Sequence, residues 1–170
     1  MSQFLHIASH RDLTGAIQKY NPTHVVIIRN INSSKDSKGP PWSLAQQGLF
    51  EFLDLQFDDN WEVKGNNLAN HPQTRDIQRL LYFAQTIKPE SRIICSCTAG
   101  ISRSPAAALI LTAASNPGLS PQEAFNRILQ VRAQALPNPY MLELAARLGL
   151  PQELHTIVSA YRNKFNLDSN

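Results

Sequence analysis

The sequence predicts an α/β protein with one small, mostly parallel central sheet that is flanked by helices and followed by a helical C-terminal half. Two observations lead to this fold class. Short β-branched and apolar segments alternate with helical patterns in the first part of the chain, and only helical patterns follow the last of these segments. Such alternation is typical of parallel strands that are connected by covering helices.

The first half of the chain supplies three predicted strands. They are expected over residues 3–8, 23–30 and 49–57. The second is a β-branched run bounded by turn residues, which indicates a buried strand. A helix over residues 10–20 separates the first two strands and ends before Pro22. Residues 31–42 are polar and predict an exposed loop, and residues 58–72 form a long irregular connection, which is often a functional feature in a compact domain.

The second half is mostly helical. A helix is expected from Gln73, because apolar residues recur there at helical spacing: Ile77, Leu80, Leu81 and Ala84. Residues 91–97 then form an apolar strand that is too short for a helix. Further helices are expected over residues 104–114, 120–132, 138–150 and 151–165. The first of these has Pro105 in its first turn and is apolar all round, which indicates a helix packed in the middle of the fold. The second begins with a capping box, Ser120 and Glu123.

Length and charge restrict the class of protein. The chain has 170 residues, and its 16 basic and 13 acidic side chains give a formal net charge of +3. That length suits one domain over residues 1–170, which we take to be a monomer. A slight basic excess fits an anionic ligand but lacks the concentrated basic stripe of a nucleic-acid-binding protein. The longest apolar run, PAAALILTAA, is about half as long as a membrane-spanning helix. We therefore expect neither nucleic acid nor a membrane as a partner.

The cysteines indicate a reducing compartment. Cys95 and Cys97 are the only two, and one residue separates them. That spacing suits neither a disulfide framework nor a four-ligand zinc site. The five histidines do not approach metal-ligand spacing either, so we expect no metal and no other cofactor. The first residues, MSQFLHIASHRD, lack the long apolar core of a signal peptide. These features predict a cytoplasmic protein.

The segment RIICSCTAGISRSPAAALI, residues 92–110, places a thiol, a glycine turn and an arginine between the last strand and a helix. In parallel sheets, ligands bind beyond the carboxyl ends of the strands, where the chain turns into a helix. A short loop there can direct several N–H groups inward, and the positive end of the next helix completes an anion site. The planar fork of Arg103 matches two oxygens of a phosphate. The residues predicted to bind substrate are Thr98, Ala99, Gly100, Ile101, Ser102 and Arg103.

Cys97 is the candidate nucleophile of this segment. The positive fields of the loop and of Arg103 favour the thiolate, which is the reactive form of cysteine. Ser104 can donate a hydrogen bond to the sulfur and ease its departure in a second step. The same serine is a suitable N-cap for the helix that includes Pro105.

Hydrolysis of an ester also needs a proton donor for the leaving oxygen, and a carboxylic acid on a loop is suited to this. Asp58 and Asp59 follow the predicted strand over residues 49–57. If that strand lies beside the strand over residues 91–97, these carboxyl groups come near the loop. We favour Asp59, because Asp58 directly follows Phe57 and is expected to point away.

The stretch CTAGISRS resembles the Cys-x5-Arg-Ser/Thr signature of the cysteine-based protein tyrosine phosphatases. The wider pattern, including LQFDD and VRAQALPNPYMLEL, is most similar to the compact dual-specificity-type branch and its bacterial relatives, over roughly residues 24–148. The resemblance implies a phosphatase-like fold and cofactor-free hydrolysis of phosphomonoesters. It implies as substrate a phosphorylated protein or a small phosphomonoester, with phosphotyrosine-type aryl phosphates favoured.

The resemblance also implies a role for each matching residue. Cys97 would form a phosphocysteine intermediate, and Arg103 would hold the phosphoryl oxygens. Ser104 would assist the thiolate, and Asp59 would act first as general acid and then as general base. Asn138 would support the loop, although with Pro139 it is also a sound helix start on its own.

Two departures from the family leave alternatives open. Ser96 stands where the family commonly has a histidine that orders the loop, and the acidic loop lacks a Trp-Pro-Asp sequence. A catalytically weak or inactive phosphate-binding interaction module is therefore the main alternative. Arsenate reduction or sulfur transfer with Cys95 is a third, although Cys95 also fits a buried apolar position. Trp42 and Trp61 either wall a substrate pocket or cover the core.

Overall fold

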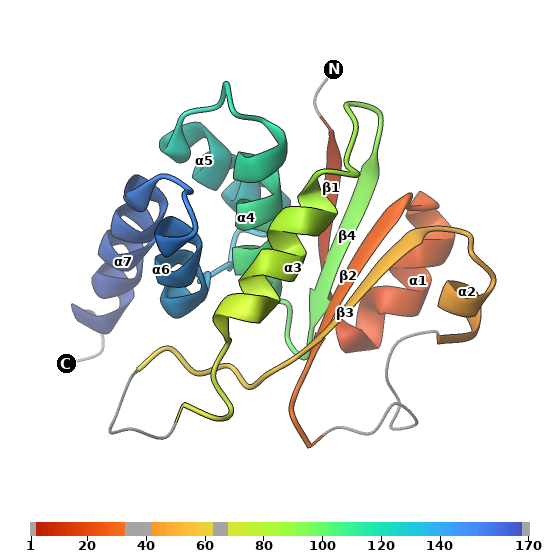
Figure 1. Cartoon of the computed structure of the whole chain (residues 1–170), viewed down its shortest axis with the longest axis horizontal. Helices are drawn as coiled ribbons and strands as arrows, with labels where there is room; N and C mark the ends of the chain where they lie inside the picture. Colours follow the sequence, from red (N-terminus) through yellow and green to blue (C-terminus); the bar gives the residue numbers. More distant parts are fainter. Residues whose placement is uncertain (1–2, 33–41, 63–67, 168–170) are drawn as a thin grey trace.

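Four parallel strands form one sheet in the computed structural model, which describes residues 3–32, 42–62 and 68–167. The strands are β1 (Phe4–Ser9), β2 (His24–Arg29), β3 (Glu51–Gln56) and β4 (Arg92–Cys97). They lie in the order β1-β4-β2-β3 (Figure 1). Because each pair is parallel, all four carboxyl ends lie at one edge of the sheet. Cys97 therefore ends an inner strand, beside Ser9 of β1.

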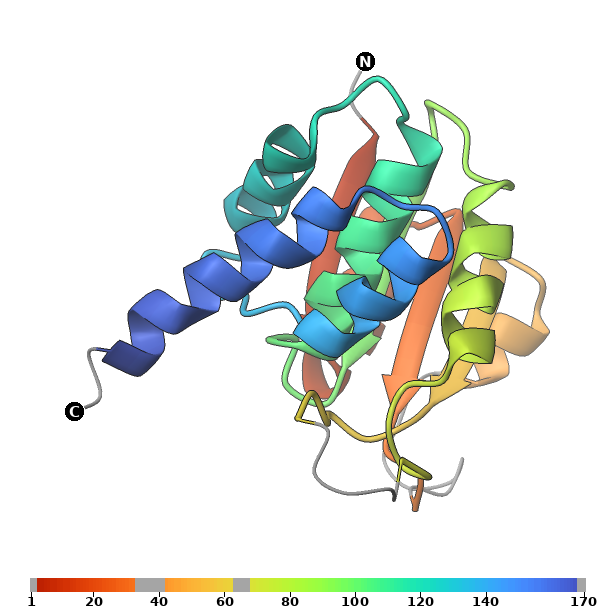
Figure 2. The same ribbon diagram turned by 60° about the vertical axis from the view of Figure 1, so that its left-hand side comes forward.

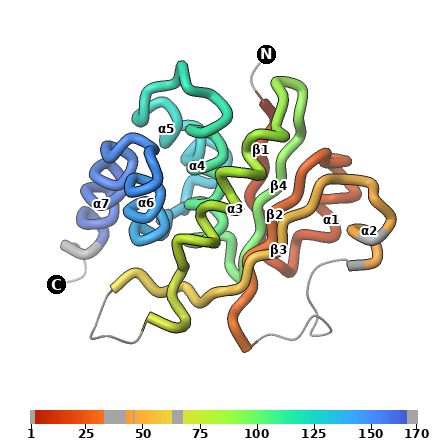
Figure 3. The backbone as a smooth tube through the Cα atoms, in the orientation of Figure 1, coloured from red at the N-terminus to blue at the C-terminus, as the bar shows by residue number. Residues whose placement is uncertain are grey.

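Helices cover both faces of this sheet. They are α1 (His10–Tyr20), α2 (Trp42–Gln46), α3 (Thr74–Ala84), α4 (Arg103–Ser115), α5 (Pro121–Val131), α6 (Pro139–Arg147) and α7 (Gln152–Leu167). Helices α1 and α2 lie on one side, and the remaining helices lie on the other (Figure 1). Figure 2 shows α6 and α7 in front of α4, which is thus enclosed between the sheet and the C-terminal helices. The backbone trace in Figure 3 follows the same path from β4 into α4.

The sequence explains how the helices nearest the sheet begin and end. Helix α1 starts after Ser9, whose side-chain oxygen accepts a hydrogen bond from the N–H of Asp12, and it ends at Asn21 in a left-handed conformation. Helix α4 has no polar face, and every residue from Arg103 to Thr112 is buried. A helix that is apolar all round can be stable only inside the fold. The polar first turn of α4 is therefore buried together with its apolar body.

Two clusters of buried side chains form the core. The larger cluster lies between the sheet and helices α3 to α7 and includes Cys95 and Cys97. The smaller cluster lies between the sheet and α1 and includes Ile94. Because successive side chains of a strand point to opposite faces, Ser96 points toward the α1 side.

These elements confirm the predicted fold class, and most predicted boundaries differ from the observed ones by one or two residues. The five-residue helix α2 was not predicted, because it is too short to show a periodicity. It follows the predicted exposed loop over residues 31–42, of which 33–41 lie outside the described residues. Helix α4 begins at Arg103 with Ser102 as its N-cap residue, so the prediction of Ser104 as N-cap is wrong.

Strand β3 does not lie beside β4, because β2 lies between them. The condition under which the two aspartates were expected to reach the loop is thus not met, and they approach it by another path. No helix in the described part of the chain is both long and apolar enough to cross a bilayer.

Candidate active site

The loop between β4 and α4 turns sharply at Gly100. This residue has φ +69°, a left-handed conformation that glycine adopts without steric cost. A Cβ atom there would lie 3.0 Å from the carbonyl carbon of Ala8 and 3.0 Å from the nitrogen of Ser9. Glycine is thus required both by the turn and by the close approach of the loop to the end of β1.

Four successive carbonyl groups of the loop point away from its centre. The Arg132 side chain donates from Nη2 to the carbonyl of Ala99 (3.2 Å) and from Nε to that of Gly100 (3.1 Å). The backbone N–H of Leu136 donates to Ile101 O (2.7 Å). The backbone N–H of Asn138 donates to Ser102 O (3.1 Å). The segment that connects α5 to α6 therefore fixes the outer side of the loop.

This arrangement determines where the N–H groups point. In a trans peptide the C=O of one residue and the N–H of the next point in opposite directions, and none of the described peptides is cis. The N–H groups of residues 100–103 are therefore directed to the inner side of the loop. No described residue accepts a hydrogen bond from them. Inward N–H groups at the start of a buried helix form an anion-binding site.

Arg103 presents one edge of its guanidinium group to the same place. Its Nη1 donates to Asn30 Oδ1 and to the carbonyl of Phe57, both at 2.7 Å, which fixes the plane of the group. Its Nη2 donates to Thr98 Oγ1 at 3.2 Å, and its buried Nε has no partner among the described residues. Nε and Nη2 are the pair that Arg29 uses to bind both carboxylate oxygens of Asp54. Arg103 thus retains a bidentate edge for an anion.

Cys97 lies at the base of the loop and is 2% exposed. Its Sγ is 3.1 Å from Oγ of Ser104, which is fully buried in the first turn of α4. A hydroxyl at this distance can donate to a thiolate and stabilise it. The structure therefore brings together the predicted nucleophile and the predicted assisting serine.

The acidic segment reaches the loop by crossing the carboxyl end of β2. The N–H of Phe57 donates to Arg29 O at 3.0 Å, so the chain continues beside β2 after β3 ends. Asp59 then accepts a hydrogen bond from Ser102 Oγ at 2.7 Å. Asp58 instead accepts from the N–H of Ile31 at 3.0 Å. Of the two candidate acids, Asp59 lies at the loop.

Asn138 connects this acid to helix α6. It is fully buried, and its Oδ1 accepts from the N–H of Met141 at 3.1 Å, which makes it the N-cap of the helix. Its Nδ2 donates to Asp59 Oδ1 at 2.9 Å and to Asn60 O at 3.2 Å. The two readings of Asn138, helix start and support of the site, thus involve different atoms of one side chain.

A cavity of about 220 Å³ opens above Cys97. Its lining residues are Asp59, Trp61, Cys97, Thr98, Ala99, Ile101, Ser102, Arg103, Leu136 and Arg162. Trp61 thus walls a pocket, whereas the side chain of Trp42 lies outside the described residues. A larger cavity of about 470 Å³ lies between the start of β1 and helices α4 and α5, but no cysteine, aspartate or glutamate lines it. The smaller cavity is therefore the candidate active site.

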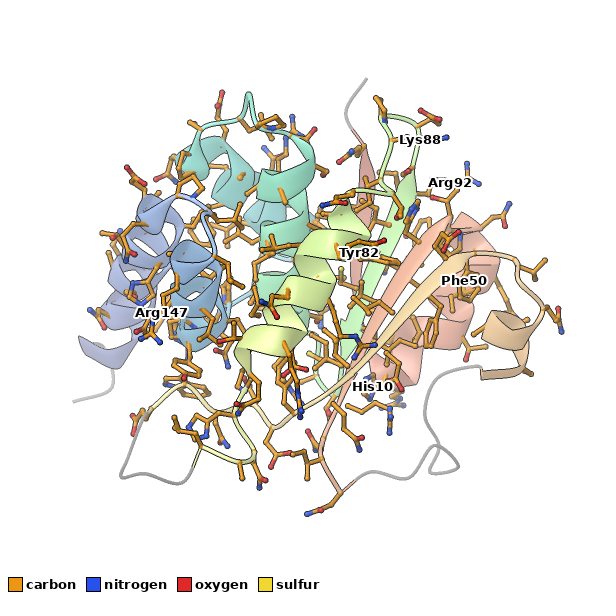
Figure 4. All side chains as sticks on the ribbon, viewed as in Figure 1. His10, Phe50, Tyr82, Lys88, Arg92 and Arg147 are labelled. Carbon is orange, nitrogen blue, oxygen red and sulfur yellow. The ribbon has the colours of Figure 1, made fainter. Side chains whose placement is uncertain are left out.

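Three further polar side chains lie near the loop: Cys95, Ser96 and His10. Burial and the neighbouring Cys97 raise the pKa of Cys95, so that thiol stays protonated. Ser96 Oγ is buried and has no partner among the described side chains and backbone groups. Burial, followed by the positive charge of Arg103, lowers the pKa of His10, which lies near the carboxyl ends of the strands (Figure 4). Within the described ranges, no group of three or more His, Cys, Asp and Glu side chains could hold a metal ion.

Three residues at the site were not predicted from the sequence: Asn30, Arg132 and Arg162. Asn30 orients Arg103, Arg132 holds the loop carbonyls, and Arg162 lines the cavity. Asn30 gave a usable signal, because it directly follows a buried parallel strand, where site residues gather. Arg132 is part of the stretch that carries the family resemblance, but its backbone partners are not visible in a sequence. Arg162 gave no signal.

No protein-family model matches the chain, and no curated protein matches it. Solved structures do match, and one is a human tyrosine phosphatase-like serine/threonine/tyrosine-interacting protein with TM-score 0.60 and 20% identity over 85% of this chain and 89% of that one. The structure of Tk-PTP in the active form matches with TM-score 0.59 and 16% identity, over 89% of this chain and 93% of that one. PTPMT1 in complex with PI(5)P gives TM-score 0.58 and 18% identity over 94% of each chain. The chain therefore has the fold of the cysteine-based protein tyrosine phosphatases, as its resemblance to them implies.

Proposed function

We propose that this protein is a cysteine-dependent phosphomonoester hydrolase. One observation carries the proposal: Cys97, Arg103 and loop residues 98, 99, 101 and 102 line one cavity, while the loop carbonyls are bonded on its outer side and Arg103 Nε has no partner among the described residues. Donors fixed in advance around the equatorial oxygens of a phosphoryl group stabilise the charge that spreads over them in the transition state. Donors in this number suit a dianion better than a carbonyl oxygen.

The reaction takes two steps. In the first, Cys97 Sγ attacks phosphorus, the S–P bond forms and the P–O ester bond breaks, while Asp59 gives a proton to the leaving oxygen. In the second, water attacks phosphorus, its proton passes to Asp59, and the S–P bond breaks to release phosphate. Ser104, 3.1 Å from the sulfur, stabilises the departing thiolate. Residues of this chain thus supply each group that the two steps use.

The favoured substrate class is an aryl phosphate, such as phosphotyrosine in a protein. The cavity of about 220 Å³ is smaller than the pockets of about 300–1,000 Å³ that enclose whole small molecules, so it suits one phosphorylated side chain. Apolar atoms of Trp61, Ile101 and Leu136 line it and can pack against an aromatic ring. We further propose that the protein acts as a single domain in the cytoplasm, where a free nucleophilic thiol persists.

A phosphate-binding module without turnover is the second candidate. Ser96 occupies the position of the family's histidine, and its buried Oγ makes no hydrogen bond with any described residue. One similar structure is described as a tyrosine phosphatase-like interacting protein, which is a role that does not require hydrolysis. This candidate keeps the anion site and removes only the reactivity of Cys97.

Hydrolysis of p-nitrophenyl phosphate by the wild type and by Cys97→Ser tests the proposal. We expect turnover that EDTA leaves unchanged, that vanadate inhibits and that the variant lacks. Vanadate binding without turnover in the wild type would favour the second candidate. The pH dependence of Cys97 alkylation gives an independent readout, because only an enzyme needs this thiol as a thiolate near neutral pH.

A further inference from the structure

Arg162 of α7 contacts two segments that meet at the site. Its Nη1 donates to Leu136 O at 2.5 Å and to Pro137 O at 3.3 Å. Its guanidinium carbon lies 4.6 Å from the centroid of the Trp61 ring, which is within the range of a cation–π interaction. No function described above uses this residue, although it lines the cavity above Cys97.

The two contacts of Arg162 join the acid to the anion-binding loop. On one side, the backbone N–H groups of Leu136 and Asn138 donate hydrogen bonds to the carbonyls of Ile101 and Ser102. On the other side, Trp61 lies two residues after Asp59, on the same segment. Trp61 is 40% exposed, so neighbouring residues cover only part of its side chain. Arg162 contacts both sides and so joins Trp61 to residues 136 and 137.

Charge supports the same arrangement. Burial lowers the pKa of Arg162, and the negative charge of Asp59 opposes this, so the two groups lie close enough to interact. A guanidinium group is suited to the position, because it can donate to carbonyls within its plane and stack on an indole with its face. A lysine ammonium group can provide only part of this.

We propose that Arg162 is a positioning residue for the proton transfer: it fixes the Trp61 segment against residues 136 and 137 and so keeps Asp59 at the leaving oxygen. This inference rests on the proposed function, because it assigns to Asp59 the role of general acid. Arg162 acts through Trp61 and the backbone, and it does not bind the transferred phosphoryl group.

The contact itself can be tested without any activity. Trp42 is the only other tryptophan in the sequence, so Trp42→Phe leaves Trp61 as the sole reporter. In that background, we expect Arg162→Gln to increase quenching of Trp61 fluorescence by acrylamide. Arg147→Gln is the matched control, because Arg147 is on α6, its side chain is 63% exposed and its ion pair is with Glu143 on the same helix (Figure 4). Unchanged quenching in Arg162→Gln would overturn the inference.

The positioning role of Arg162 in proton transfer is tested with two esters that differ in leaving group. Phenyl phosphate needs protonation of its leaving oxygen, and p-nitrophenyl phosphate needs it much less. We expect Arg162→Gln to lower kcat for phenyl phosphate about 10-fold and for p-nitrophenyl phosphate less than about 2-fold. Arg162→Lys should recover part of the loss, and Arg147→Gln should match the wild type.

Trp61→Leu removes the other partner of the contact and should give the same pattern. Because the two residues act through one contact, the double variant should lose no more than either single variant. In Arg162→Gln, equal losses on both esters, or a rise in KM without a fall in kcat, would overturn the inference and make Arg162 a substrate-binding residue. A wild type that hydrolyses neither ester would refute the proposed function and the positioning role together, whereas normal turnover with unchanged Trp61 quenching refutes the positioning role alone.

Discussion

Replacing Asn138 separates the two tasks of its side chain. Oδ1 accepts from the N–H of Met141 and starts helix α6, whereas Nδ2 donates to Asp59 and to Asn60 O. Asn138→Ala removes both, and Asn138→Ser removes only the second, because serine is also a favourable N-cap residue. The two variants therefore form a matched pair.

The contacts give the expected magnitudes. Loss of the N-cap costs about 1 kcal/mol. Loss of Nδ2 leaves a half-buried carboxylate and a carbonyl each short of a donor, which costs a further ~1–2 kcal/mol. Asn138→Ala should thus lower the free energy of unfolding by about 2–3 kcal/mol and Asn138→Ser by about 1–2 kcal/mol. In a chain of this length, the difference of about 1 kcal/mol corresponds to a Tm difference of about 2–4 °C.

The assays are thermal unfolding and turnover of the two esters. Both variants should lose about 10-fold in kcat for phenyl phosphate and little for p-nitrophenyl phosphate, because both release Asp59 from Nδ2. Equal Tm values for the two variants would show that the cap contributes nothing. Wild-type turnover of phenyl phosphate in both would show that Nδ2 does not position the acid.

Further predictions concern the acid, the turn and pH. Asp59→Asn should reduce turnover of phenyl phosphate by about 10²-fold or more, and Asp58→Asn should reduce it far less; the reverse order would move the acid by one residue. Gly100→Ala should cost about 2–4 kcal/mol, from a left-handed backbone plus a Cβ in contact with β1, and should abolish vanadate binding; a variant that still binds vanadate would contradict this reading of the loop. Burial lowers the pKa of His24, so the folded protein binds fewer protons than the unfolded chain and its stability should fall as the pH drops below the ordinary value of 6.5. Urea denaturation from about pH 7.5 to 5 should show a smaller fall in His24→Gln, and an equal fall would exclude this residue as a source.

The fold could be predicted because its signals are local. The β-branched run of β2 and the all-round apolar helix α4 each indicate their own burial. The motif from Cys97 to Ser104 is also contiguous, so one segment carries the candidate nucleophile, the proposed anion site and the candidate assisting hydroxyl. The sequence predicted Ser104 as the N-cap residue, whereas the structure has Ser102 there. The prediction was wrong because a serine directly before a proline is also a typical helix start.

The rest of the site could not be predicted, because it depends on distant parts of the chain. Asn30, Arg132 and Arg162 reach the site from three separate elements, and two of them bond to backbone carbonyls, which any residue possesses. Asp59 was favoured because Asp58 directly follows Phe57 and was expected to point away. Its approach across β2 depends on a strand order that local patterns do not determine.

The hydrogen bonds that direct the loop carbonyls outward come from residues that are synthesised after the loop. Cys97 and the loop leave the ribosome before Arg132, Leu136 and Asn138, which turn the loop carbonyls outward. At about 5–20 residues per second, about 2–8 s pass between the synthesis of Cys97 and that of Asn138, the last of these partners. A nascent chain that ends before α6 thus has the thiol of Cys97 without the contacts that direct the loop N–H groups inward. The proposed anion site is thus completed late in biosynthesis, even though its sequence motif lies in the middle of the chain.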